Sequence, residues 1–117
     1  MKSEPRYNAL RDLIAAREPI EQTLTELRRF PWDSERVLVV LDRSDVARVL
    51  RRYLRGGLSA KQCVAWADAI EARDDIGFEP EWVEMLKQFI FELANPELGW
   101  ALSHDAARDR LRLLEGR

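Results

Sequence analysis

Residues 44–55, SDVARVLRRYLR, carry the clearest structural signal in the sequence. Apolar side chains recur there at i, i+3, i+4, i+7 and i+8, the stripe that a helix packed against a core needs. Asp42 or Ser44 can accept hydrogen bonds from the free N–H groups of the first turn, and Gly56-Gly57 supplies a left-handed stop. The spacing therefore predicts a core-facing helix over 44–55. Its apolar positions are Val46, Val49, Leu50, Tyr53 and Leu54.

The chain continues with the same helical period. Ser59 caps a predicted helix over 60–73, and Pro80 suits the first position of another over 80–94, where its missing N–H would be unpaired anyway. Ser103 can cap a last short helix that stops at Gly116. Together with the helix over 44–55, these segments predict a bundle.

The N-terminal third adds two helices and one extended segment. Apolar spacing predicts helices over 7–17 and 19–30, separated at a proline. Residues 36–41, RVLVVL, are typical of a strand, yet no second strand-like run is visible to pair with them. We interpret them as an extended segment laid over the helices, with pairing across a dimer as the alternative. The sequence thus predicts an all-α fold, a small bundle of four to six helices forming a single domain over 1–117, with one extended segment near 36–41.

Composition agrees with a globular domain. The chain has 117 residues, 46% of them hydrophobic, which is enough for a core without disulfides or a structural metal. We expect Tyr53, Trp66, Trp82 and Phe89 to be largely buried and close together, because they occupy the inward stripes of consecutive helices. The longest apolar run is too short to span a bilayer and the N-terminus has no signal-peptide pattern, so the predicted location is cytoplasmic.

Few residues suggest chemistry. His104 is the only histidine and lies at a predicted helix start, with no nucleophile motif to serve. Cys63 is the only cysteine and falls on an apolar helix face, as a structural thiol does. Gly56-Gly57 lacks the lysine and hydroxyl residues of a phosphate loop. The sequence therefore predicts no enzyme, no catalytic residue, no metal site and no cofactor.

One acidic cluster is the candidate partner-binding site: Glu71, Asp74, Asp75 and Glu79. The first three lie at i, i+3 and i+4, so they share a face if the helix extends that far. Their spacing matches no calcium loop. Two interpretations stay open, a structural turn held by Arg73 and a docking surface for a basic protein.

The charge distribution favours the docking interpretation. Residues 56–105 contain three basic and ten acidic residues, whereas residues 1–55 contain twelve basic and nine acidic ones. Acidic surfaces attract basic partners and repel nucleic acid. A row of arginines on the helix over 44–55 could grip phosphates, but no aromatic residue interleaves with it. We predict a basic protein partner, no nucleic acid and no membrane. The arginines are Arg48, Arg51, Arg52 and Arg55.

A recurrent motif set links residues 49–98 to known sequences. It comprises an arginine-rich helix ending in Tyr-Leu-x-Gly, then Leu-Ser-Ala, Trp-Ala, the acidic turn Glu-x-Arg-Asp-Asp-Ile-Gly-Phe-Glu, and Glu-Leu-Ala-Asn-Pro-Glu-Leu. In this chain these are Tyr53, Leu54, Gly56, Leu58, Ser59, Ala60, Trp66, Ala67, Glu71–Glu79 and Glu92–Leu98. This pattern resembles a set of small bacterial proteins, mostly of unknown function. The bundle with its Leu-Ser-Ala helix is also similar to colicin D-type immunity proteins.

Three functions follow as hypotheses. The first is a non-enzymatic protein-interaction module, which the resemblance suggests is an immunity-like inhibitor covering a basic effector with its acidic surface. The second is a homo-oligomeric structural or regulatory protein, for instance a homodimer that associates through 36–41. The third, an enzyme using the carboxylates of residues 71–79 with a metal, has the least support.

Overall fold

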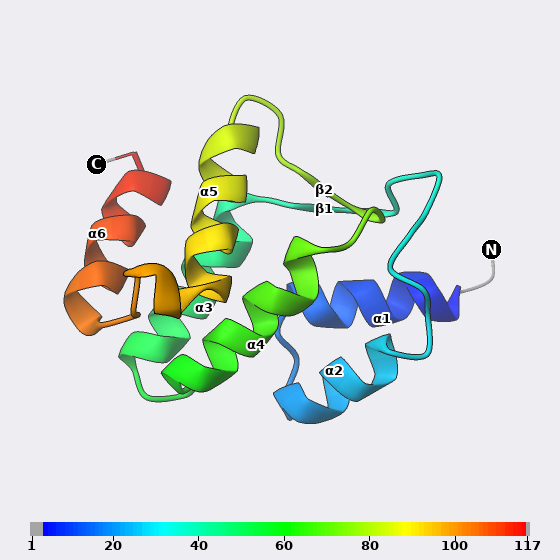
Figure 1. The fold of residues 1–117 in the computed structure, drawn as a ribbon, viewed down its shortest axis with the longest axis horizontal. Coiled ribbons are helices and arrows are strands. Elements are labelled where there is room, and N and C mark those ends of the chain that lie inside the picture. Colours follow the sequence, from blue (N-terminus) through cyan, green and yellow to red (C-terminus); the bar gives the residue numbers. More distant parts are fainter. Residues whose placement is uncertain (1–3, 117) are drawn as a thin grey trace.

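A computed structural model describes residues 4–116 and contains six α-helices in that range, with a two-stranded sheet (Figure 1). The predicted fold class, a small all-α bundle of four to six helices, is confirmed. In chain order the elements are α1 (Pro5–Ile14), α2 (Ile20–Leu27), β1 (Val39–Leu41), α3 (Arg43–Leu54), α4 (Ala60–Glu71), β2 (Ile76–Phe78), α5 (Val83–Ala94), the short 3-10 helix η1 (Pro96–Leu98) and α6 (His104–Leu114).

Side-chain caps define where three helices begin. The Asp42 carboxylate accepts from the Asp45 N–H at 3.0 Å, and the Asp45 carboxylate accepts from the Asp42 N–H at 2.9 Å, a reciprocal box at the start of α3. Ser59 makes the same kind of box with Gln62 on α4. Ser103 accepts from the Ala106 N–H on α6. The predicted caps at Ser59, Ser103 and Asp42 are confirmed, since each satisfies an otherwise free donor.

The helix predicted over 80–94 begins three residues late, at Val83. Pro80 precedes the helix instead of opening it. The reason lies in Glu81, whose φ of 74° is left-handed, and in a turn closed by the Trp82 N–H and the Glu79 carbonyl. A residue with a left-handed backbone cannot be part of a right-handed helix, so α5 starts only after Glu81. The helix predicted over 60–73 likewise ends early, at Glu71.

The strand-like segment has a partner inside the chain. β1 pairs in parallel with β2, with Val39 opposite Ile76 and Leu41 opposite Phe78. The expectation that 36–41 lacks a partner was therefore wrong: the segment neither lies unpaired over the helices nor needs a second copy for pairing. The partner strand is only three residues long and contains Gly77, so it has no strand signal of its own.

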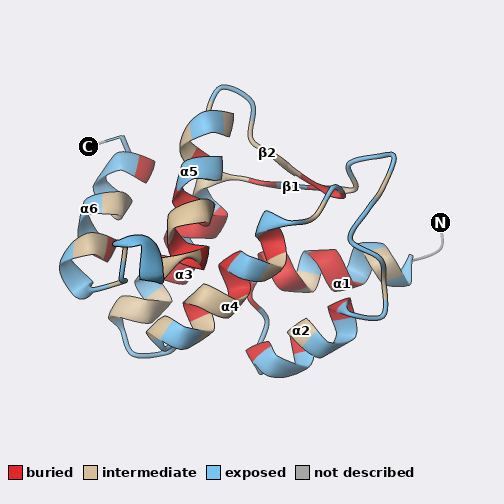
Figure 2. Cartoon of the chain, viewed as in Figure 1, coloured by how far each residue is buried: buried red, intermediate tan, exposed pale blue. Residues whose placement is uncertain are grey.

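The core lies where α1, α3, α4 and α5 meet under the inner face of the sheet (Figure 2). α5 packs along α4, α6 along α3, and α2 along α1. Trp66 is fully buried at the centre, and Phe89 is also buried. Tyr53 and Trp82 are only half-buried, so the expected four-aromatic core is half correct. The Trp82 ring is covered by the Arg43 guanidinium, 4.2 Å from its centroid, and the Tyr53 ring meets His104 edge-on. None of the helices in residues 4–116 has the length and apolar character needed to cross a bilayer.

Candidate interaction surface

A buried carboxylate organises the end of the molecule where α1 begins. Asp75 is fully buried just before β2, and two arginines bind it. Arg73 donates to both Asp75 oxygens, at 2.9 and 3.1 Å, and Arg6 of α1 donates at 3.0 Å. A buried carboxylate needs such partners because its desolvation is costly. We call Asp75, Arg6 and Arg73 the Asp75 node.

The same node holds the loop that follows α2. The Pro31 carbonyl accepts from Arg6 at 2.9 Å and from Arg73 at 2.7 Å, and the Asp33 carbonyl accepts from Arg6 at 2.8 Å. Between them, the Trp32 carbonyl accepts from the Asp74 N–H at 2.9 Å. Three consecutive carbonyls of the loop thus accept hydrogen bonds from other parts of the chain. The Trp32 side chain nevertheless remains 60% exposed.

The four predicted site residues do not form one surface. α4 ends at Glu71, so the helical face that would have joined them is not continued. Glu71 and Asp74 are exposed and have no ion-pair partner among residues 4–116. Asp75 lies inside the node, which fits the structural-turn interpretation for that residue. The acidic turn is therefore part structure and part free surface.

Glu79 belongs to a separate ion pair. Its carboxylate accepts from the Arg43 backbone N–H at 3.0 Å and from the Arg43 guanidinium at 3.0 and 3.2 Å. These hydrogen bonds lower the pKa of Glu79. Because Arg43 also lies over the Trp82 ring, this pair ties the start of α3 to the turn before α5. Glu79 thus joins two elements of the fold.

The arginine row on α3 is largely engaged within the chain. Arg48 pairs with Asp45 at 3.2 Å, Arg51 with Glu115, and Arg52 with Glu18 at 2.7 Å. Arg52 also donates to the Ala16 carbonyl at 2.8 Å, at the C-terminal end of α1. Arg51 and Arg52 therefore connect α3 to other parts of the fold, and Arg48 is paired within α3, so three of the four guanidiniums have a carboxylate partner in the chain.

A charged hollow of about 410 Å³ lies between the start of α3 and the end of α6. Its walls contain both members of two ion pairs, Arg43 with Glu79 and Arg51 with Glu115. Opposite charges there satisfy each other. Within residues 4–116, no group of three or more His, Cys, Asp or Glu side chains is arranged to hold a metal ion.

Sequence reasoning missed an exposed apolar set next to the acidic turn. Trp32, Val37 and Val40 have exposed fractions of 60%, 56% and 49%. The sequence offers one signal, a tryptophan directly after Phe30-Pro31, at the end of the helix predicted over 19–30. The valines were hidden within the strand-like run of residues 36–41, because the sequence does not show which side of a strand stays uncovered.

Cys63 provides a pH test of core burial. Burial raises the pKa of its thiol to about 11, from an ordinary value near 9. Above pH 9 the unfolded thiol loses its proton while the folded one keeps it, so this group makes folding less favourable as pH rises from about 9 to 11. The loss should reach roughly 2–3 kcal/mol. Urea titrations across this range should show a steeper decline for the natural chain than for Cys63→Ala, which shares every other titrating group. Parallel declines would show that the thiol is accessible.

Comparison of the chain with protein-family models, with curated proteins and with solved structures finds no match.

Proposed function

We propose that this protein is a non-enzymatic interaction module that binds a basic protein through its acidic surface. The observation that supports this most is the placement of Glu71 and Asp74, two exposed carboxylates without an ion-pair partner among residues 4–116, beside an exposed tryptophan on an anchored loop. Aromatic residues held in place are the usual anchors of protein interfaces. An immunity-like inhibitor that covers a basic effector is the form of this function that the resemblance to immunity proteins favours.

The wider charge pattern supports a basic partner. Six of the ten acidic residues in 56–105 have no ion-pair partner among residues 4–116. Of the three basic residues in that range, Arg73 is bound to Asp75, which leaves Lys61 and Lys87. The uncompensated field is therefore negative, and such a field speeds encounter with a cationic protein. The six are Asp68, Glu71, Asp74, Glu81, Glu84 and Glu97.

A charge-neutralising pair of substitutions tests this function. A partner captured from native lysate would be purified, and its association with the natural chain compared with that of Glu71→Gln/Asp74→Asn. We expect association to slow about fivefold, with dissociation changing less than about twofold, because exposed charges act mainly through steering. Raising the salt concentration should bring the association rates of the natural chain and the double variant closer together, since salt screens charges beyond about 8–10 Å.

The matched control is Asp105→Asn/Asp109→Asn on α6, at the opposite end of the molecule from α1 (Figure 1). It changes the net charge by the same amount. Equal slowing in both double variants would show that only total charge matters and would contradict a localised surface. Neither pair is buried, so both variants should keep their folding stability within about 0.5 kcal/mol.

Self-association is the second candidate function. The observation that favours it is the exposure of Val37 and Val40 on the two-stranded sheet. Sedimentation velocity over a range of concentrations tests it directly, and a concentration-independent monomer would exclude it.

A further inference from the structure

The two faces of the small sheet differ sharply. Val39, Leu41 and Ile76 point into the core and are buried. On the other face, Val40 lies opposite Gly77 and stays 49% exposed. Parallel strands are normally covered on both faces. This sheet therefore presents an apolar face that no element within residues 4–116 covers.

Gly77 lets a second valine join that face. A Cβ at Gly77 would stand only 3.0 Å from Val37 Cγ1, so the absence of a side chain allows Val37 to lie close over β2. Val37 is still 56% exposed on its outer side. Val37 and Val40 thus both lie beside Gly77 and are both exposed.

Trp32 is a third exposed apolar residue, and its backbone lies next to the turn that precedes β2. Its carbonyl is bound to the Asp74 N–H, and the Leu38 N–H is bound to the Asp75 carbonyl at 2.8 Å. Trp32 and residues 38–40 therefore lie beside residues 74–77, and residues 33–36 belong to the loop that connects them. We call Trp32, Val37 and Val40 the apolar strip. Because the Asp75 node fixes the Trp32 loop from inside, little conformational entropy would be lost when a partner covers the strip.

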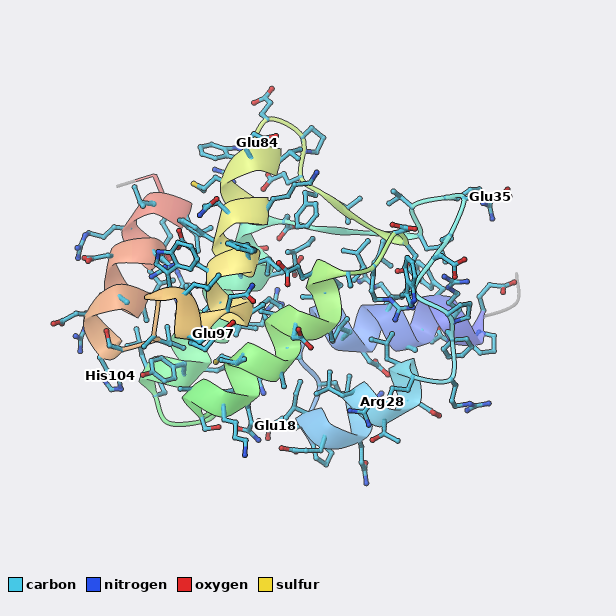
Figure 3. The ribbon with its side chains drawn as sticks, in the orientation of Figure 1. Glu18, Arg28, Glu35, Glu84, Glu97 and His104 are labelled. Atoms are coloured by element: carbon cyan, nitrogen blue, oxygen red, sulfur yellow. The ribbon has the colours of Figure 1, made fainter. Side chains whose placement is uncertain are left out.

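The rim of the apolar strip is acidic. Asp33, Glu35, Glu71 and Asp74 are exposed there, and two exposed arginines near Trp32 in the chain, Arg28 and Arg36, have no ion-pair partner among residues 4–116. Figure 3 shows Glu35 projecting away from the body of the molecule. A twofold pair of copies joined through the apolar strip would bring two such rims together, and like charges would oppose it.

We propose that the apolar strip docks a basic amphipathic segment of the partner protein. Apolar side chains of that segment cover Val37, Val40 and the Trp32 ring, while its lysines and arginines face the carboxylates of the rim. This inference rests on the proposed function, because it specifies the chemistry of the same partner. It adds that affinity comes from the apolar strip and the rate of encounter from the rim.

Two synthetic peptides of equal positive charge serve as probes. The first is an amphipathic helix with leucines along one face, and the second has serine at every leucine position. Titration into the ¹⁵N-labelled full chain should show that the leucine peptide binds at least about tenfold more tightly, with amide shifts concentrated at residues 32–40 and 74–77. Val37→Thr/Val40→Thr and Trp32→Ala should each weaken the leucine peptide about tenfold and leave the serine peptide unchanged.

Leu98→Ala and Leu113→Ala are the matched controls. Both leucines are exposed to a similar degree, 55% and 56%, on η1 and α6. They should leave both affinities unchanged. Far-UV circular dichroism would verify the fold of each variant, and Val40→Thr alone would decide the result if the double variant unfolded.

The outcomes separate this inference from the proposed function. If both peptides bind equally and only Glu71→Gln/Asp74→Asn weakens them, the acidic surface binds cations and the docking role of the apolar strip is wrong. Failure of both peptides to bind would overturn the inference and count against the proposed function as well. If sedimentation showed a dimer that Val40→Thr dissociates, the inference would also be wrong, because a second copy of the chain would then cover the apolar strip.

Discussion

Replacing Trp66 by alanine should destabilise the folded protein by about 4 kcal/mol, measured by urea denaturation. Removing a fully buried aromatic side chain leaves a cavity and costs about 3–5 kcal/mol in other cores. Here a hydrogen bond is lost too, because the Trp66 indole N–H donates to the Leu13 carbonyl at 2.7 Å near the end of α1. In the variant that carbonyl would keep only its hydrogen bond from the Ala16 N–H, at 2.8 Å.

Two comparisons isolate the cause. Trp66→Phe removes the donor and part of the ring system but keeps most of the bulk, so it should cost clearly less than alanine. Trp32→Ala changes the same residue type at a 60% exposed position and should stay within about 0.5 kcal/mol of the natural chain. A loss below about 1 kcal/mol for Trp66→Ala would mean that the indole is not the centre of the core.

Asp75→Asn should be the most damaging substitution in the acidic turn, with a loss of about 3–4 kcal/mol in the same assay. Asparagine has nearly the same shape but no charge, so Arg6 and Arg73 would lose the anion that neutralises them in a buried setting. The loop after α2 should loosen as well. Faster hydrogen exchange at the Asp74 amide, which is bound to Trp32, would report it.

Glu79→Gln is the matched control for that substitution. It also removes a carboxylate that accepts two hydrogen bonds from one guanidinium, four residues further along the chain. The side chains of Glu79 and Arg43, however, are 25% and 35% exposed. Ion pairs in contact with water contribute little, so the loss should stay below about 1 kcal/mol. Equal losses at the two positions would show that burial does not distinguish the two ion pairs.

Helix periodicity predicted the fold class because each helix has its own apolar stripe, and α3, α4 and α6 are also capped by adjacent residues. Ser59 and Ser103 lie directly before the helices they cap, so local sequence was sufficient there. The start of α5 was predicted too early because proline generally favours the first position of a helix. In this turn the left-handed backbone of Glu81 delays the helix, and the sequence does not show that. Intrinsic preference was overridden by the geometry of the turn.

The sheet could not be predicted from local sequence. β1 has a strong strand signal, but β2 is a strand only because β1 lies beside it. A three-residue partner with a glycine at its centre becomes visible only when residues 39–41 and 76–78 are close in space. The sequence also gave no sign that these strands are parallel.

The candidate site was predicted in part for a similar reason. Charge and spacing identified Glu71, Asp74, Asp75 and Glu79, but carboxylates look alike in sequence whether they are buried or exposed. What separates Asp75 from Asp74 is Arg6, which is 69 positions away. Trp32 escaped notice because tryptophan is commonly a core residue, and its exposure depends on the contacts that hold its loop outward.

The parallel pairing of β1 and β2 also bears on the order of folding. Residues 42–75, which contain α3 and α4, lie between the two strands, so the strands meet only after this long loop closes. Closing a long loop has an entropic cost that few contacts repay until the intervening helices have packed. We infer that the strands pair late, after a helical nucleus has formed around Trp66. Val37 and Val40 are then brought to Gly77 in the final step, and a nascent or partly folded chain does not display the complete apolar strip.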